Sequence, residues 1–223
     1  MFSYVFMKIL EGRPASYDRR IDRASRGRVE ALKRDVAARV PPKARVLEIG
    51  CGTAELAVRL ARRECHVDAF DRSRGMIAVA RERVTRAGML DRVRLRRMAV
   101  EGMDALPSSS YDAVVSTLVL SELSPDQQRF ALAHAARVLV PGGRLIVADE
   151  VVPRTAGRRV LHQLVRAPAL AATYLVTGET TQPIADLASE IRRAGFVVDE
   201  ELRSHGDAFA LVCAHRPREE LAA

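Results

Sequence analysis

The sequence has few residues of the kinds that build disulfide frameworks, zinc sites or surfaces for stacking nucleic-acid bases. Its 223 residues include three cysteines, no tryptophan and only 4% aromatic residues. Cys51, Cys65 and Cys213 are an odd number at wide spacing, without a CxxC pair. Neither a disulfide framework nor a metal site is therefore indicated, and the sparse aromatics argue against a base-stacking surface.

Long apolar runs and targeting signals are also missing. No stretch of 18 uncharged apolar residues occurs, so no membrane-spanning helix is expected. Residues 1–10 are apolar, but they lack a basic start and a small-residue cleavage site, which makes them a poor signal peptide. We expect a reducing, cytoplasmic setting, with contact to a membrane surface left open.

Positively charged residues outnumber negatively charged ones in this sequence. The formal net charge is +8, and 33 of the 36 basic residues are arginine, since only three lysines occur. Genome composition explains such a balance in many proteins, and a basic face for nucleic acid or an anionic membrane is the sharper alternative. Because the arginines are scattered through predicted helices, a nucleic-acid partner is disfavoured.

Short apolar runs alternate with segments of helical spacing along the whole chain. This rhythm predicts an α/β fold with a doubly wound, mostly parallel seven-stranded sheet, in which the last two strands pair antiparallel. We expect a single domain over 1–223, with a helical cap at 1–42, including a helix over 15–39, and a helical insertion at 153–183 after strand five. The predicted strands are 45–49, 66–70, 93–95, 111–116, 144–148, 196–198 and 209–213.

A glycine-rich loop follows the first strand, at the sheet edge where doubly wound folds bind ligands. Glu48 lies inside the strand end, Gly50 and Gly52 allow a sharp turn, and Asp71 follows the second strand about 20 residues later, where ribose hydroxyls are bound. The sixth position of a dinucleotide motif would be glycine, but Glu55 stands there. A carboxylate at this place repels a pyrophosphate and suits a cationic ligand.

The pattern Glu-x-Gly-x-Gly-x-Ala with Asp71 beyond it resembles the cofactor loop of class I S-adenosylmethionine-dependent methyltransferases. The segments 71–76, 111–116 and 139–143, the last as a turn before strand five, continue the likeness. The family often has Asp-Ala after strand three, where this chain has Ala99-Val100, which leaves only backbone donors for the adenine. The cofactor-binding residues that the resemblance implies are Glu48, Gly50, Cys51, Gly52, Asp71, Arg72, Met76, Ala99, Val100 and Ser116.

The ends of the chain resemble a narrower group, the corrinoid-protein-associated methyltransferases. The likeness rests on Ser3–Leu10, Tyr17–Arg20, Ser121–Ser124, Ala148–Glu150 and Leu161–Pro168, and it continues at 173–175 and 180–181. It implies a corrinoid-linked acceptor as one possibility. It also makes Tyr17 a candidate lid residue over the cofactor, with a helix-capping role as the alternative.

The insertion is mostly apolar over 158–177, is interrupted by arginines and His162, and contains Pro168, which predicts a kink. Three interpretations stay open: a helical lid, a docking surface for a corrinoid protein or another partner, and a helix that touches a membrane. If the acceptor must lose a proton, His162 is the preferred general base, with Glu122 and Glu150 weaker candidates.

The sequence thus predicts a methyltransferase that acts on a small, hydrophobic or corrinoid-linked acceptor by in-line displacement. Two alternatives remain: a cofactor-binding partner protein with little transfer activity, and a membrane-surface enzyme acting on a lipid-like substrate. A nucleic-acid methyltransferase is disfavoured, because no Asn/Asp-Pro-Pro-Tyr or Pro-Cys signature occurs. The oligomeric state stays open.

Overall fold

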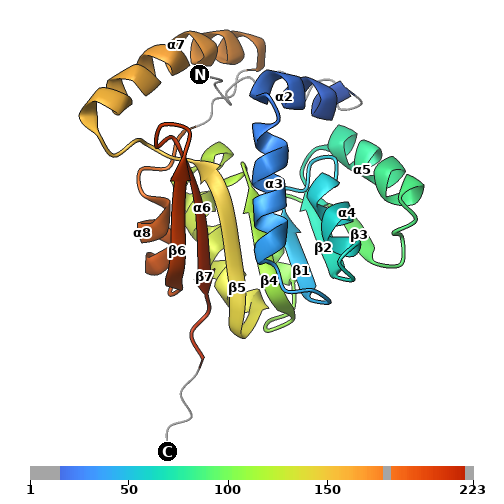
Figure 1. Ribbon diagram of the computed structural model, residues 1–223. Coiled ribbons are helices and arrows are strands. Elements are labelled where there is room, and N and C mark those ends of the chain that lie inside the picture. The colour runs from blue at the N-terminus through green and yellow to red at the C-terminus, as the bar shows by residue number, and fades with distance from the viewer. Residues whose placement is uncertain (1–15, 178–181, 219–223) are drawn as a thin grey trace, which may run out of the picture.

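Seven strands form a single sheet in the computed structural model, which describes residues 16–177 and 182–218 (Figure 1). Their order is β3-β2-β1-β4-β5-β7-β6. The first five pair in parallel, and β7 is antiparallel to both β5 and β6. This topology confirms the predicted fold class. The strands are β1 (Arg45–Ile49), β2 (His66–Asp71), β3 (Val93–Arg97), β4 (Tyr111–Thr117), β5 (Leu139–Glu150), β6 (Val197–Ser204) and β7 (Phe209–His215).

Helices cover both faces of the sheet because its central strands are apolar on both sides. In β1, Leu47 packs into the cluster of one face and Val46 into the cluster of the other, as the two-residue period of a strand requires. The helices are α2 (Tyr17–Ser25), α3 (Arg28–Arg39), α4 (Glu55–Ala61), α5 (Arg74–Arg86), α6 (Pro125–Val138), α7 (Ala156–Thr177) and α8 (Leu187–Arg193), with 3-10 turns η3 (Val100–Ala105) and η4 (Leu120–Glu122).

Two local expectations are wrong. The helix predicted over 15–39 is broken in two, because Arg26 and Gly27 take φ of 54° and 75°, and this left-handed pair ends α2 before α3 begins. The turn predicted before strand five is part of β5, which begins at Leu139. The amide of Gly142 and the carbonyl of Gly143 both bond to the backbone of Arg216, and these bonds continue the ladder past β7.

The insertion contains one long helix, α7, which lies with α2 over the end of the sheet where the parallel strands finish (Figure 1). The helix continues through Pro168, so the proline does not end it. The apolar segment 1–10 and residues 180–181, which carried part of the family likeness, lie outside the described residues. Within the described part of the chain, no helix is long and apolar enough to span a bilayer.

Candidate functional site

The loop after β1 places two glycines, which have no side chains, at the carboxyl end of the sheet. Gly50 and Gly52 have φ of 68° and 51°, which glycine adopts without strain. A Cβ on Gly50 would lie 2.3 Å from Cγ2 of Val119, so a larger residue does not fit there. A Cβ on Gly52 would meet nothing within 4 Å, and Gly52 borders a cavity at this end of the sheet. The loop can therefore approach a ligand closely at Gly52.

Asp71 is fixed at the end of β2 by two backbone donors. Its Oδ2 accepts a hydrogen bond from the amide of Gly52 at 2.9 Å, and its Oδ1 accepts one from the amide of Ser73 at 2.8 Å. Ser73 in turn caps α5 by accepting from the amide of Met76. Since each carboxylate oxygen has a second lone pair, Asp71 can still accept bonds from two neighbouring hydroxyls.

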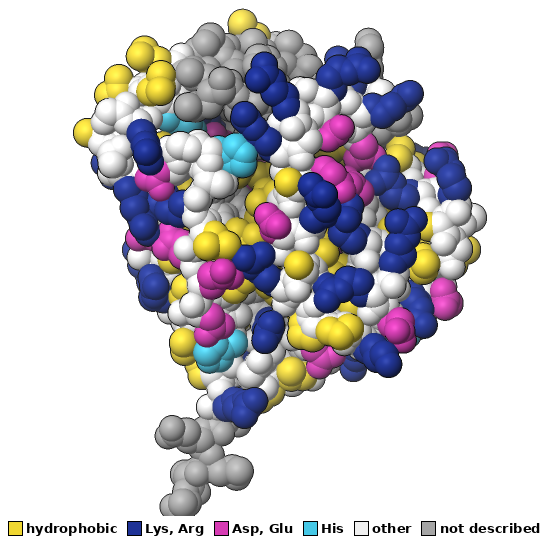
Figure 2. Space-filling view, in the orientation of Figure 1, with side chains coloured by type: hydrophobic (Ala, Val, Ile, Leu, Met, Phe, Trp, Pro, Cys, Tyr) yellow, Lys and Arg dark blue, Asp and Glu magenta, His cyan; other side chains and the backbone are white. Residues whose placement is uncertain are grey.

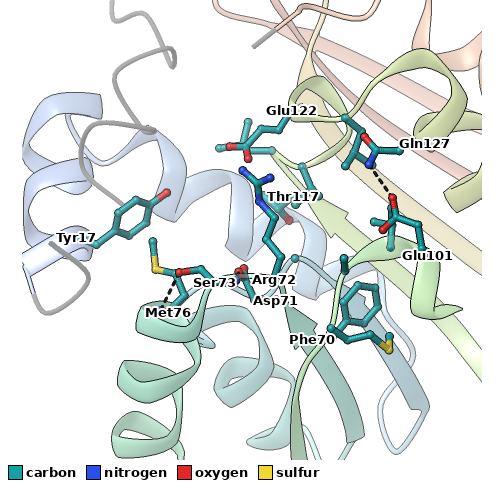
Figure 3. Close-up of a pocket in the computed structure, with 18 residues that line it drawn as sticks. Tyr17, Phe70, Asp71, Arg72, Ser73, Met76, Glu101, Thr117, Glu122 and Gln127 are labelled. Atoms are coloured by element: carbon teal, nitrogen blue, oxygen red, sulfur yellow. Dashed lines mark hydrogen bonds between the residues drawn. The ribbon is translucent and has the colours of Figure 1, made fainter. Parts of the chain in front are cut away.

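A cavity opens between the glycine loop, the end of β2 and the segment after β4 (Figure 3). The guanidinium of Arg72 reaches into its middle, and Tyr17 closes one side from α2. The structure thus brings together most of the site residues predicted from sequence. Those that line the cavity are Tyr17, Gly50, Gly52, Asp71, Arg72, Met76, Ala99 and Val100.

Glu48 lies behind the loop and does not border the cavity. Its side chain is 4% exposed, and its Oε2 has no hydrogen-bond partner among the described residues. Burial raises the pKa of this carboxyl to about 8, although the Lys33 ammonium opposes that rise. Burial therefore favours the protonated form of Glu48, and a cation bound nearby would favour its ionised form.

Cys51 and Ser116 are also buried next to the cavity and do not line it. Cys51 donates its amide proton to the carbonyl of Phe70 at 2.9 Å, which ties the loop to β2. Burial raises the pKa of its thiol far above the ordinary range, so Cys51 is not a reactive thiolate. Ser116 is 1% exposed, at the end of β4. For both residues, direct cofactor contact stays a prediction.

His162, the predicted general base, contacts Glu150 and does not face the cavity. It lies on the inner side of α7, where its Nε2 is 3.1 Å from Oε1 of Glu150, and both side chains are buried. Arg166 approaches the same oxygen at 3.6 Å. Neither His162 nor Glu150 borders the cavity, so a role for His162 as general base stays a prediction. Across the described ranges, no group of three His, Cys, Asp or Glu side chains could hold a metal ion.

Sequence reasoning missed several residues that do border the cavity. Glu101, on η3, accepts a hydrogen bond from Nε2 of Gln127 at 2.7 Å, and this bond lowers the pKa of Glu101. Glu122, which ranked below His162 as a base, lies in the cavity wall on η4. The signal was available, because β4 neighbours β1 and the residues after its carboxyl end must meet the loop. The other lining residues not predicted are Phe70, Ser73, Met98, Thr117, Leu118, Val119 and Leu123.

Comparison with known proteins connects this geometry to a family. A family described as "Methyltransferase domain" matches residues 46–143, which include the glycine loop, Asp71 and the segment after β4. Residues 46–143 form a class I methyltransferase domain. Its cofactor is S-adenosylmethionine.

Curated relatives of the methyltransferase domain carry several names. A ubiquinone biosynthesis O-methyltransferase of Xylella fastidiosa is 37% identical over 51% of this chain and 45% of its own length. An S-adenosyl-L-methionine-dependent Diels-Alderase of Talaromyces variabilis is 31% identical over 58% of this chain and 43% of its own. A demethylmenaquinone methyltransferase of Listeria monocytogenes is 32% identical over 67% and 64%. The chain therefore spans about half to two thirds of the length of these relatives.

Solved structures share the fold over most of the chain. The S-adenosylmethionine-dependent methyltransferase SibL, in its apo form, has a TM-score of 0.66 at 27% identity, over 88% of this chain and 57% of that one. An O-methyltransferase family protein from Burkholderia thailandensis has a TM-score of 0.70 at 21% identity, over 93% and 60%. The narrower corrinoid-associated grouping is not represented among these matches.

The residues of the methyltransferase domain fit a cationic nucleoside. Of the described residues, three carboxylates border the cavity against one guanidinium, that of Arg72. Gly52 leaves room beside the loop, and Asp71 has acceptors to spare for a ribose diol. Thioether and aromatic side chains supply an apolar wall for a flat base. The carboxylates are Asp71, Glu101 and Glu122, and the wall residues are Phe70, Met76 and Met98.

Proposed function

We propose that this protein transfers a methyl group from S-adenosylmethionine to a small, hydrophobic acceptor. The observation that carries the proposal is the cavity that joins the glycine loop, the doubly anchored Asp71 and an apolar wall. Of two relatives, one is named for ubiquinone biosynthesis and another for demethylmenaquinone, and these names support an apolar acceptor.

The chain contributes mainly alignment and a water-poor site. When bound, S-adenosylmethionine supplies a methyl group on a cationic sulfur, already activated for in-line displacement. Asp71 would hold the ribose, and Gly52 would let the backbone approach. Tyr17, which is 8% exposed and comes from α2, would close the cavity over the cofactor as a lid.

Proton removal is needed only if the acceptor atom carries a proton. Glu122 borders the cavity, whereas His162 does not, so Glu122 is the better placed base for a hydroxyl acceptor. A corrinoid-linked acceptor with reduced cobalt would need no base. The Glu122→Gln variant separates these cases when it is assayed at saturating cofactor: for a hydroxyl acceptor turnover falls about 10²-fold or more, and for cobalt it is retained.

Calorimetry with S-adenosylhomocysteine tests the cofactor site. Replacing Asp71 by Ala removes charge-assisted hydrogen bonds, and the affinity should fall at least about tenfold. The matched control is Asp91→Ala, a change at an exposed carboxylate between α5 and β3, which should bind like the parent. If Asp71→Ala binds as tightly as the parent, the ribose assignment is wrong.

Transfer itself is tested with tritiated S-adenosylmethionine and a cell extract. The expected result is a labelled product that partitions into an organic solvent and is absent with Asp71→Ala. The name of the Talaromyces relative supports a second candidate, a cofactor-binding protein whose activity is not methyl transfer. Tight binding of S-adenosylhomocysteine without transfer to any extract component would favour that candidate.

A further inference from the structure

Among the described side chains of α7, the buried ones are polar and several apolar ones are exposed. Its inner side presents His162 and Arg166 to the buried Glu150, and Thr173 on the same side is fully buried. At 100° per residue, positions 162, 166 and 173 fall on one side of a helix. A surface helix of a globular protein normally has the opposite arrangement, with its apolar stripe against the core.

The outer side of α7 exposes large apolar side chains near its start and near its end. Leu164 is 68% exposed and Leu175 is 84% exposed, and these two residues lie within about 20° of one another around the helix. Single exposed apolar residues are ordinary, but five on one face of one helix mark an interaction surface. The outer face consists of Val160, Leu161, Leu164, Tyr174 and Leu175.

Exposed arginines lie at the start of α7 and on α2, at the same end of the molecule. Arg158 and Arg159 are exposed at the start of α7, and Arg19, Arg20 and Arg23 are exposed on α2. Figure 2 shows yellow side chains along α7 and dark-blue side chains over α2 at the top of the molecule. The chain as a whole carries a net charge of +8.

We propose that the outer face of α7 inserts into the interface of an anionic membrane, with the arginines of α2 on its phosphates. An apolar helix face combined with neighbouring cations is the pattern of helices that lie in a membrane surface. Charge decides between a bilayer and a second copy of the chain. Two copies meeting here would bring like charges together, whereas anionic headgroups neutralise them.

The placement also explains how an apolar acceptor could reach the cavity. Tyr17 borders the cavity from α2, the same helix that carries the three arginines, so membrane and cavity would meet at one end of the sheet. Membrane binding does not depend on the proposed methyl transfer, and the two are measured separately.

Vesicle co-sedimentation of the full chain tests the proposal. With vesicles that contain phosphatidylglycerol the protein should sediment, with pure phosphatidylcholine it should not, and added salt should release it. The double variant Leu161→Glu/Leu164→Glu should bind at least tenfold more weakly, because two apolar anchors become charges. Leu90→Glu is the control, since Leu90 is 64% exposed but lies between α5 and β3.

A second pair of variants tests the arginines at equal net charge. The triple variant Arg19→Gln/Arg20→Gln/Arg23→Gln should bind roughly fivefold more weakly for each charge removed. Arg62, Arg86 and Arg94 are exposed at the opposite end of the sheet, and their triple change to Gln should have little effect. Thermal unfolding confirms that each variant is folded.

Three results would overturn the proposal. The first is no sedimentation with anionic vesicles. The second is an equal loss of binding in Leu90→Glu and the α7 double variant. The third is a dimer in light scattering that the α7 double variant dissociates, with no vesicle binding by the parent, which would assign the face to a second copy. Calorimetry with S-adenosylhomocysteine is unaffected in each case, so failure here is distinct from failure of the cofactor site.

Discussion

The helices α6 and α7 precede and follow the same strand, β5, yet they bury different kinds of side chain. The face of α6 against the sheet is apolar, with Leu132 and Val138 in the core. The described buried side chains of α7 are His162 and Thr173. Hydrophobic burial therefore attaches α6, whereas the described buried side chains of α7 are polar. The exposed apolar side chains of α7 are left for another partner.

Two consecutive residues with carboxyl side chains, Asp149 and Glu150, lie at the end of β5. Because successive strand residues point to opposite faces, these two side chains contact different elements. Asp149 accepts a hydrogen bond from the amide of Ser121 on η4 at 3.3 Å, whereas Glu150 faces His162 on α7. The end of β5 thus connects the cavity wall on one face with the insertion on the other.

The largest expected effect is on the free energy of unfolding, and it compares a buried leucine of α6 with an exposed leucine of α7. Leu132→Ala should lower the free energy of unfolding by about 2–5 kcal/mol, because Leu132 is buried in the core. Leu164→Ala should change it by less than about 0.5 kcal/mol, since Leu164 is exposed. Urea denaturation measures both. Equal losses would show that the outer face of α7 is packed in solution.

The next effect tests the polar attachment of α7. His162→Ala leaves the buried carboxylate of Glu150 without one of its partners, at a cost of about 1–3 kcal/mol. Hydrogen exchange should become faster over α7 and stay unchanged over α6. Gln163→Ala, at an exposed position on α7 next to His162, is the control. Unchanged protection of α7 in His162→Ala would contradict the proposed attachment.

A pH effect of roughly a few kcal/mol comes from Asp149. Burial raises its pKa to about 7, so the native state keeps a proton that the unfolded chain releases above about pH 4. The contribution of this proton to the free energy of unfolding is fully present below pH 4, and it decreases as the pH rises towards 7. Asp149→Asn should therefore gain stability relative to the parent at pH 8 compared with pH 4. Urea denaturation of both proteins at pH 4 and pH 8 measures this gain. An equal difference in the free energy of unfolding at the two pH values would contradict the prediction.

The smallest expected change is in cofactor affinity when the insertion is shortened. Deleting residues 158–177 removes α7, which does not border the cavity, so affinity for S-adenosylhomocysteine should stay within about twofold. Acceptor turnover should be lost, because the deletion removes the segment over that end of the sheet. A large loss of cofactor affinity would place α7 in the cofactor site.

Local sequence signals predicted most of the sheet and the floor of the cavity. The apolar run 45–49 matches β1, and the loop glycines and Asp71 lie where the spacing placed them. These features depend on neighbours in sequence or on one crossover. The break at Arg26 and Gly27 was missed, because the apolar spacing continues across it and only the left-handed backbone ends the helix.

The remaining site residues depend on contacts between distant segments. Glu101 and Gln127 are 26 residues apart and meet only because η3 packs beside α6. His162 was chosen as a lone histidine on an apolar helix, and nothing in its local pattern indicated Glu150 as its neighbour. Glu48 was expected to face the cofactor, but it lies behind the loop, and its role stays a prediction.

A crystal structure with S-adenosylhomocysteine would locate the cofactor site by direct observation. We expect the nucleoside beside Gly52, with its ribose hydroxyls on the carboxylate of Asp71 and its base against Met76 and Phe70. A crystal in which the ligand lies elsewhere, or in which Arg72 and Tyr17 fill that cavity at saturating ligand, would contradict it.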